Sequence, residues 1–277
     1  MTMNLMAQKS IEENFRFVPI EAKPIMIWQW MDGLITAEGI TADLEAYKEA
    51  GIGGVQQFLV GGPVQVDVCD STNAVGTDSW RSLMLHAIRE CDRLGLSFGT
   101  HNCPGWSSSA FPTVTPEYSM QRLVWTDTIV NVGKRMDRIL LHRPDVDSIY
   151  NYYRDIAVII MPVLDTVTHT SIIVRRDSIV GSLPKGKWRV FRFGHTTNGR
   201  TNYATAPTGG VGLECDKMSR EAVRRYWEGY PMQLIKLAGD LTGKTFQRME
   251  IDSYEAGGQE WTRLMPEEFK TRKGYDL

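Results

Sequence analysis

Three apolar runs between residues 24 and 102 indicate how this chain folds: Pro24-Ile-Met-Ile-Trp-Gln-Trp30, Gly54-Val-Gln-Gln-Phe-Leu-Val60 and Leu96-Ser-Phe-Gly-Thr-His-Asn102. Each run is short and bounded by polar or turn-forming residues, as expected of a buried strand. Two amphipathic stretches with helix-capping residues at their ends separate the runs, over residues 42–50 and 79–94. The order strand, helix, strand, helix, strand with short connections predicts a parallel sheet with right-handed crossovers.

Two architectures share this order, the doubly wound sheet and the (β/α)8 barrel. A doubly wound, dinucleotide-binding sheet would place a glycine-rich loop after its first strand, and Met31-Asp-Gly-Leu34 does not supply one. The barrel is therefore favoured. Later in the chain a helix over residues 220–238 precedes a fourth strand over 246–252 and the start of a helix over 266–273. Together these segments predict about four βα units of a partial barrel.

The periodicity becomes β-like between the third and fourth predicted barrel strands, which indicates a small β-rich insertion. We therefore divide the chain into the first barrel units (residues 1–122), the insertion (123–193) and a last segment (194–277) that holds a loop, the long helix and the fourth strand. Because four strands are half of an eight-stranded barrel, we expect this chain to be part of a longer, truncated catalytic region.

Composition excludes several classes of protein. The 277 residues carry a net charge of −2, so no basic footprint for nucleic acid or an anionic membrane exists. The longest apolar run, residues 156–164, is too short to span a membrane. Residues 1–14 lack the apolar core of a signal peptide, which predicts a cytoplasmic location. Four cysteines without a CxxC pair exclude a zinc knuckle, and eight Trp with ten Tyr are compatible with sugar binding.

A glutamate follows the predicted fourth strand at the position where barrel enzymes place catalytic groups. Glu255 lies in Ile251-Asp-Ser-Tyr-Glu-Ala-Gly-Gly-Gln-Glu-Trp261, and catalytic side chains converge at the carboxyl ends of barrel strands. We predict that Glu255 is a general acid; the alternative is a solvated loop glutamate. Asp252 and Glu260 compete for the role, and Asp252 is alternatively a residue that orients a neighbour by hydrogen bonding.

Polar and aromatic residues also follow the third predicted strand. His101, Asn102 and Trp106 are candidates for binding sugar hydroxyls, with Trp106 stacking on a pyranose ring, and buried polar packing is the alternative. Further along, Glu214 and Asp216 stand in Gly212-Leu-Glu-Cys-Asp-Lys217, and their oxygens suit a hard cation such as calcium. An ordinary surface loop is the alternative for that segment.

The chain resembles the α-L-rhamnosidases of glycoside hydrolase family 106. The motifs that carry the resemblance run in order from about Phe15 to the end: Trp28-Gln-Trp30, Gly51-Ile-Gly-Gly54, Glu90-Cys-Asp-Arg-Leu-Gly-Leu96, His101-Asn-Cys-Pro-Gly-Trp-Ser107, Gly212-Leu-Glu-Cys-Asp-Lys217, Ile251-Asp-Ser-Tyr-Glu255, Gln259-Glu-Trp-Thr262 and Glu268-Phe-Lys-Thr-Arg-Lys-Gly-Tyr-Asp-Leu277. No single motif is decisive, and the ordered set is fairly specific.

The resemblance implies a longer, multi-domain enzyme with a (β/α)8 catalytic domain that depends on calcium. Such enzymes hydrolyse terminal α-L-rhamnosyl linkages in plant polysaccharides and glycosides with inversion, and many are periplasmic or secreted. By position Glu255 matches the general acid, and the base is expected from a later strand. Gln259 and Trp261 join the candidates for contacting the sugar. The alternative from another class is a non-catalytic carbohydrate-binding or degenerate barrel protein.

Overall fold

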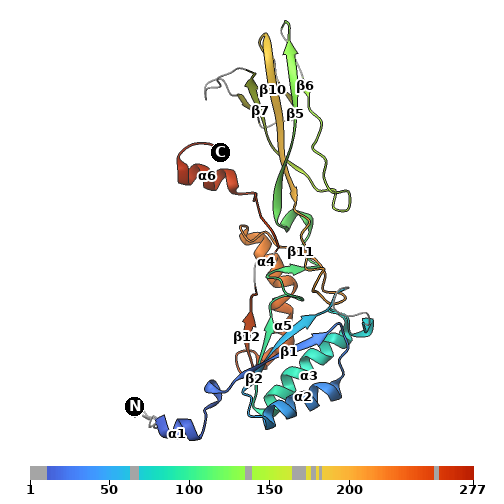
Figure 1. Ribbon diagram of the computed structural model, residues 1–277, viewed down its shortest axis with the longest axis vertical. Coiled ribbons are helices and arrows are strands. Elements are labelled where there is room, and N and C mark those ends of the chain that lie inside the picture. The colour runs from blue at the N-terminus through green and yellow to red at the C-terminus, as the bar shows by residue number, and fades with distance from the viewer. Residues whose placement is uncertain are drawn as a thin grey trace. The chain divides into compact units, whose positions relative to one another are not determined.

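The computed structural model describes residues 11–62, 69–134, 139–163, 173–175, 179–180, 183–252 and 256–277. The chain forms two compact units (Figure 1). Unit 1 comprises Met1–Ser108, Asn202–Val211 and Glu228–Ser253, and unit 2 comprises Ser109–Thr201, Gly212–Trp227 and Tyr254–Leu277. This division differs from the one expected at residues 122 and 193, because the chain returns to unit 1 twice after residue 201.

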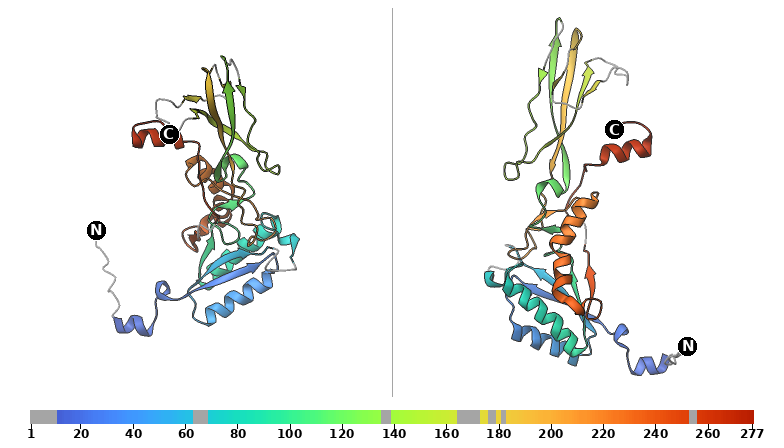
Figure 2. Two further views of the ribbon diagram at one scale, coloured as in Figure 1. Left: turned by 45° about the horizontal axis from the view of Figure 1, so that its top comes forward. Right: turned by 180° about the vertical axis from the view of Figure 1, so that it is seen from behind.

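A four-stranded parallel sheet forms the centre of unit 1. Its strands lie in the order β1 (Ile25–Met31), β2 (Gly54–Val60), β3 (Ser97–His101) and β12 (Phe246–Glu250), so strands that follow one another in the barrel-like pattern are neighbours. The predicted parallel sheet is thereby confirmed. Helices α2 (Ala37–Glu49) and α3 (Asp78–Leu94) lie side by side against one face of the sheet (Figures 1 and 2).

Side-chain hydroxyls cap both of these helices. Thr36 Oγ1 accepts the backbone N–H of Gly39 at the start of α2, so this helix begins five residues before the predicted position. Thr77 Oγ1 accepts the N–H of Trp80 at the start of α3, and Gly95 ends that helix with φ +63°. α3 is buried on a stripe that repeats every three or four residues; its buried members are Trp80, Met84, Ala87, Ile88 and Cys91.

The two faces of the sheet differ in burial. On β1, Trp28 and Trp30 point toward the helices: Trp28 packs against Tyr47 of α2 and donates its indole N–H to Asp43. These two tryptophans are core residues, with exposures of 4% and 2%. Successive side chains of a strand point to opposite faces of the sheet, so Ile25 and Ile27 lie on the face opposite Trp28. Ile27 is 61% exposed. The face of β1 turned away from the helices is therefore uncovered in the described chain.

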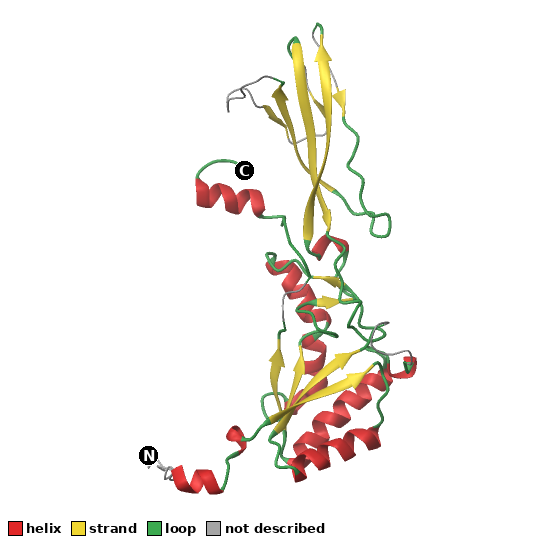
Figure 3. Ribbon diagram, in the orientation of Figure 1, coloured by secondary structure: helices red, strands yellow, loops and turns green. Residues whose placement is uncertain are grey.

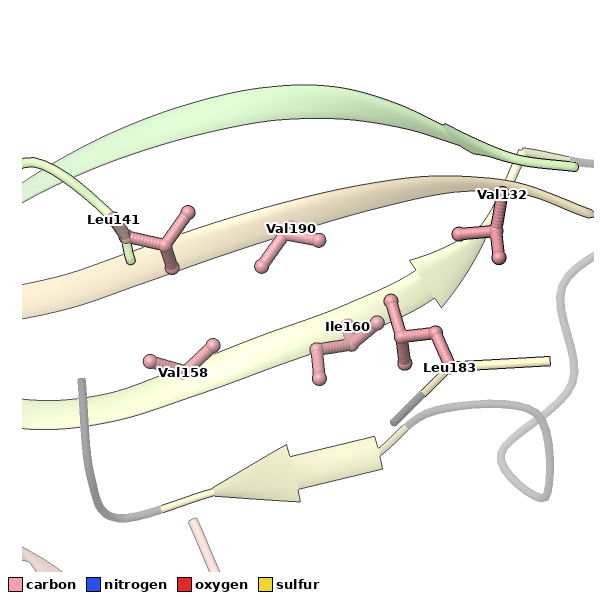
Figure 4. Close-up of a cluster of buried hydrophobic side chains, with 6 residues drawn as sticks. All are labelled: Val132, Leu141, Val158, Ile160, Leu183 and Val190. Atoms are coloured by element: carbon pink, nitrogen blue, oxygen red, sulfur yellow. The ribbon is translucent and has the colours of Figure 1, made fainter. Parts of the chain in front are cut away.

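Unit 2 holds the predicted β-rich segment as an antiparallel sheet (Figure 3). Its strands lie in the order β5 (Gln121–Val132), β10 (Gly186–Thr197), β7 (Arg154–Pro162) and β8 (Ile173–Arg175). A small apolar cluster lies on this sheet (Figure 4), and its buried members are Val132, Leu141, Val158, Ile160, Leu183 and Val190. Val158 and Ile160 are two residues apart, as expected of one face of a strand.

The strand β10 is longer than the sequence predicted. It continues through Gly194-His-Thr-Thr197, which we expected to be a loop, and His195, Thr196 and Thr197 are buried. A register shift follows Phe193, and a Cβ atom on Gly194 would lie 2.3 Å from the Tyr153 ring. Only glycine leaves room for that ring, so the residue that resembled a loop signal instead allows close packing within the sheet.

The long helix predicted over residues 220–238 is two helices, α4 (Arg220–Gly229) and α5 (Pro231–Ala238). Pro231 lacks an N–H and occupies the first turn of α5, where no intrahelical donor is needed. On α4 the buried residues are Ala222 and Tyr226, whereas the apolar Val223 and Trp227 are exposed.

The other α-helices and strands of the described residues are short. They are α1 (Ile11–Arg16), α6 (Met265–Lys273), and two pairs of two-residue strands, β4 (Ala110–Phe111) with β11 (Leu213–Glu214) and β6 (Ile139–Leu140) with β9 (Ile179–Val180). In the part of the chain that the structure describes, no helix has the length and apolar character needed to cross a membrane.

Candidate active site

The carboxyl ends of the parallel strands in unit 1 bring together residues from distant parts of the sequence. Asp32 follows β1, His101 ends β3 and is followed by Asn102, and Asp252 lies two residues beyond β12. β3 and β12 are neighbours, and His101 is in register with Glu250. The predicted convergence of polar groups from separate strands at this edge is therefore present in the structure.

His101 joins the ends of β3 and β12 through both of its ring nitrogens. Its Nδ1 lies 2.6 Å from the carbonyl oxygen of Cys103, which can only accept, so Nδ1 carries the proton. Its Nε2 accepts the backbone N–H of Asp252 at 3.1 Å. Burial lowers the pKa of His101, which keeps the ring neutral and this pair of hydrogen bonds intact. His101 is 1% exposed, so it positions the backbone of Asp252 rather than offering a nitrogen to a sugar.

Three rings stack at this edge of the sheet. The Phe58 ring lies 5.2 Å from the His101 ring at 23°, and the Trp106 ring lies 4.8 Å from Phe58 at 30°. Trp106 is the partly exposed member of the stack, and its backbone N–H donates to Thr205 Oγ1. A partly exposed aromatic ring that is held in place by such a stack is suited to contact the apolar face of a pyranose ring.

The other polar residues at this edge have structural contacts. Asn102 is buried and donates to the carbonyl oxygen of Ser108 at 2.6 Å, while its backbone N–H donates to Glu250. Asp32 has a φ of +41° and accepts the backbone N–H of Thr208 through Oδ1 at 2.6 Å. For Asn102 the geometry therefore favours the alternative reading of buried polar packing. Sequence reasoning missed Asp32, although an aspartate and glycine directly after a strand were a usable signal.

Glu255 lies outside the described residues, as do its neighbours 253 and 254. The structure does describe where the chain leaves β12: Asp252 is partly buried and its backbone is fixed by His101. A cavity of about 600 Å³ in unit 1 lies at the opposite edge of the sheet, against Ile25, Ser97 and Arg248. That edge holds the amino ends of the strands, where barrel enzymes carry residues for stability rather than for catalysis.

In unit 2 Asp216 is the centre of a hydrogen-bonded cluster. Its Oδ1 accepts from the side-chain amide of Gln259 and from the backbone N–H of Met218, and its Oδ2 accepts the hydroxyl of Thr262 at 2.7 Å. The Gln259 amide also donates to the carbonyl oxygen of Trp261 at 3.1 Å. The amide nitrogen of Gln259 is thus engaged within the protein, and the cluster fixes residues 259–262 directly after the segment that contains Glu255.

Glu214 and Asp216 do not fit the predicted role of calcium ligands. The Glu214 carboxylate is buried and receives the Lys217 ammonium at 2.7 Å and the Ser109 hydroxyl at 2.9 Å, both on Oε2. Its Oε1 has no partner among the described residues, but one free oxygen is far from the six to eight that calcium takes. No group of three or more His, Cys, Asp or Glu side chains gathers in the described chain as a metal site.

Unit 2 contains a second cavity, of about 350 Å³, that the sequence did not predict. It is bordered by Trp261, which we had singled out, and by His195 and Tyr152, which we had not. The rings of His195 and Trp261 lie 6.2 Å apart at 31°. The available signal was the pair Thr196-Thr197, since threonine favours strands, but the glycine at 194 obscured it.

Three comparisons relate this chain to known proteins. The sequence model of glycoside hydrolase family 106, described as alpha-L-rhamnosidase, matches residues 16–168 and 155–277. A protein of Formosa agariphila named "Putative beta-glucuronidase" is 34% identical over 310 residues, which cover 96% of this chain and 26% of that protein. The solved structure of a rhamnosidase from Novosphingobium sp. PP1Y superposes with a TM-score of 0.76 at 24% identity, over 97% of this chain and 42% of the other.

This chain therefore spans about a quarter of the length of the curated relative and less than half of the solved chain. The solved structure supports the fold of both units, and the family match extends across nearly all of the described residues.

Proposed function

The chain belongs to glycoside hydrolase family 106, the α-L-rhamnosidases, and we propose that it is part of the catalytic region of an inverting exo-α-L-rhamnosidase. The substrate class is a rhamnose-containing polysaccharide or glycoside. The observation that supports this assignment is the edge of the parallel sheet, where His101 fixes the chain at Asp252 and Trp106 presents an aromatic face. Glu255 follows three residues later.

We propose further that the sheet is part of a (β/α)8 barrel. The strand order β1-β2-β3-β12 has no reversal, unlike that of a doubly wound sheet. The face turned away from the helices is uncovered at β1, where Ile27 is exposed, and it carries polar groups further into the sheet: Gln56 Nε2 and Arg248 Nε are buried without a partner among the described residues. Such a face is expected to become the interior of the barrel, where side chains from the other barrel strands of a longer protein would cover it.

In the proposed mechanism Glu255 protonates the glycosidic oxygen as the leaving group departs. Inversion requires a second carboxylate about 6.5–9.5 Å away that activates a water on the opposite face of the sugar, and we assign that base to a strand outside this sequence. Trp106 would hold the ring, and His101 keeps the start of the acid-bearing segment in place. Because Glu214 and Asp216 do not form a calcium site, no step is assigned to a metal ion.

The leaving-group dependence of hydrolysis tests the role of Glu255. In the protein encoded by the whole reading frame, Glu255→Gln should lower kcat/KM on a rhamnosyl disaccharide by about 10²–10⁴-fold. It should have much less effect on 2,4-dinitrophenyl α-L-rhamnopyranoside, because that leaving group departs without a proton. Glu260→Gln is the matched control: Glu260 was the competing candidate, and its carboxylate instead accepts the backbone N–H of Leu123, so this variant should keep most of the activity.

Equal losses on both substrates would contradict the assignment of Glu255 as general acid. Proton NMR of the first-formed anomer distinguishes inversion from retention. The isolated 277-residue chain should release no rhamnose, because it lacks the proposed base. Absence of rhamnose release by the whole protein would instead favour a non-catalytic, carbohydrate-binding role.

A further inference from the structure

The cavity in unit 2 has the size and wall chemistry of a ligand site. Its volume of about 350 Å³ lies at the small end of the range of about 300–1,000 Å³ for small-molecule pockets. Six of the residues that line the cavity carry its polar and aromatic groups, and all six belong to unit 2: Glu117, Gln121, Tyr152, Arg154, His195 and Trp261. Three of its lining residues are rings in mutual contact: the Trp261 ring lies 6.2 Å from the His195 ring, and Tyr152 lies edge-on to His195 at 6.0 Å.

The hydrogen bonds of Gln121 determine which nitrogen of His195 carries the proton. Gln121 Nε2 donates to the carbonyl oxygens of Pro116 and Ser119, at 2.9 and 2.6 Å, so the amide oxygen is the atom that faces His195. His195 Nδ1 lies 2.9 Å from this oxygen and must donate to it. Nε2 then carries the lone pair and is an acceptor. Burial keeps the ring neutral by lowering its pKa to about 4, so this acceptor is present at neutral pH.

Most charged groups around the cavity have partners: the Asp216 carboxylate accepts hydrogen bonds from neutral donors, and two other carboxylates form ion pairs. Asp155 is paired with Arg192, and Glu221 with Arg225 and Arg263. Glu117 and Arg154 are exposed and have no ion pair to a described residue, although Arg154 lies over the Tyr152 ring at 5.4 Å. The Glu117 carboxylate supplies an acceptor, and the Arg154 guanidinium, which also interacts with the Tyr152 side chain, supplies a donor. Because the two charges have opposite signs, they do not favour a strongly charged ligand.

We propose that this cavity binds a neutral pyranose unit, and that unit 2 thereby holds a second saccharide site separate in its residues from the strand edge of unit 1. His195 Nε2 and Glu117 would accept hydrogen bonds from sugar hydroxyls, Arg154 would donate to a ring or hydroxyl oxygen, and Tyr152 and Trp261 would contact the apolar face. An apolar ligand would leave these polar groups unpaired, and a polyanion would meet the acidic side chains. The choice of a rhamnoside as probe rests on the proposed function.

The test is a titration of the full 277-residue chain with methyl α-L-rhamnopyranoside, followed by NMR. The reporter is the indole N–H resonance of Trp261, assigned with Trp261→Phe. We expect saturable binding in the millimolar range. Arg154→Ala and Glu117→Gln alter exposed residues, and His195→Asn retains an amide donor for Gln121 while removing the Nε2 acceptor. Each should weaken binding by about fivefold or more, as expected for the loss of one hydrogen bond.

Two controls separate this site from others. Arg122→Ala removes an exposed arginine whose side chain points to the opposite face of β5 from Gln121, and it should leave binding unchanged. Trp106→Ala, in unit 1, should also leave the Trp261 titration unchanged. The titration does not involve hydrolysis, so its outcome is read independently of whether the whole protein cleaves rhamnosides.

The proposal is overturned if the Trp261 resonance does not shift with up to ~50 mM probe, or if all three cavity variants bind as the wild type does. Loss of binding only in Trp106→Ala would place the sugar in unit 1 and also overturn it. Tighter binding of D-glucuronate than of the neutral rhamnoside would overturn the assignment of an uncharged ligand.

Discussion

Acidification should destabilise unit 2 through His195. The ring is 8% exposed, and burial together with the nearby Arg154 guanidinium lowers its pKa from 6.5 to about 4. The unfolded chain therefore binds a proton at pH values where the folded chain does not. The neutral ring contributes stability that is fully present above pH 6.5, decreases as the pH falls, and is lost below the folded-state pKa of about 4.

The magnitude follows from the size of the pKa shift. A difference of 6.5 minus about 4 is about 2.5 pKa units, and one unit corresponds to about 1.4 kcal/mol. Protonation of His195 should therefore cost unit 2 about 3 kcal/mol of unfolding free energy between pH 7 and pH 4. Arg154→Ala should raise the pKa of His195, because it removes the cation that opposes protonation.

Two measurements check this prediction. The Cε1–H shift of His195, identified with His195→Asn, gives the folded-state pKa directly. Urea unfolding of the wild type and of His195→Asn between pH 7 and pH 4 gives the stability difference, because other titrating groups are common to both proteins. His142→Gln, at an exposed histidine of the same unit, is the control and should keep the wild-type dependence. A folded-state pKa near 6.5, or parallel pH profiles for wild type and His195→Asn, would refute the reasoning.

Three further predictions concern the strand edge and the Glu214 pair. His101→Phe keeps the ring stack but removes the hydrogen bonds of His101 to the Cys103 carbonyl and the Asp252 N–H. It should cost about 2 kcal/mol and speed amide exchange at Asp252, and unchanged exchange would contradict the positioning role. Lys217→Met leaves the buried Glu214 carboxylate unpaired and should cost about 3 kcal/mol in urea unfolding, most of it recovered when Glu214→Leu is added. Removal of divalent cations with EDTA should leave the Tm of the chain unchanged, because Lys217 already neutralises Glu214 and neutral donors satisfy Asp216; a decrease above about 2 °C would show a bound cation.

Much of unit 1 could be predicted because its signals are local. The apolar runs that become β1, β2 and β3 are bounded by residues that end strands, and α3 has a hydroxyl cap at one end and a glycine at the other. The helix ending at Ala238 was predicted less well. One continuous helix was predicted over residues 220–238, but the chain starts a new helix at Pro231.

For the candidate site, the sequence could predict only which residues follow the ends of the parallel strands. A carboxyl or imidazole that follows a parallel strand is expected at one edge of the sheet, and His101 and Asp252 do meet there. Their roles could not be predicted, because a role depends on which atoms are already occupied. Both nitrogens of His101 are used within the protein, and so are both carboxylate oxygens of Asp216, although the residue types alone suggested a sugar contact and a metal ligand.

The sequence alone determined the strands and helices that carry local signals, the parallel arrangement and the family, because periodicity, capping and ordered motifs are properties of neighbouring residues. Only the tertiary structure decided which side chains are partners. His101 and Asp252 are 151 residues apart, Gln121 and His195 are 74 apart, and Asp216 and Gln259 are 43 apart. No local preference specifies such pairs: they form because strand register and packing bring together backbone segments whose polar groups would otherwise be buried without a hydrogen bond.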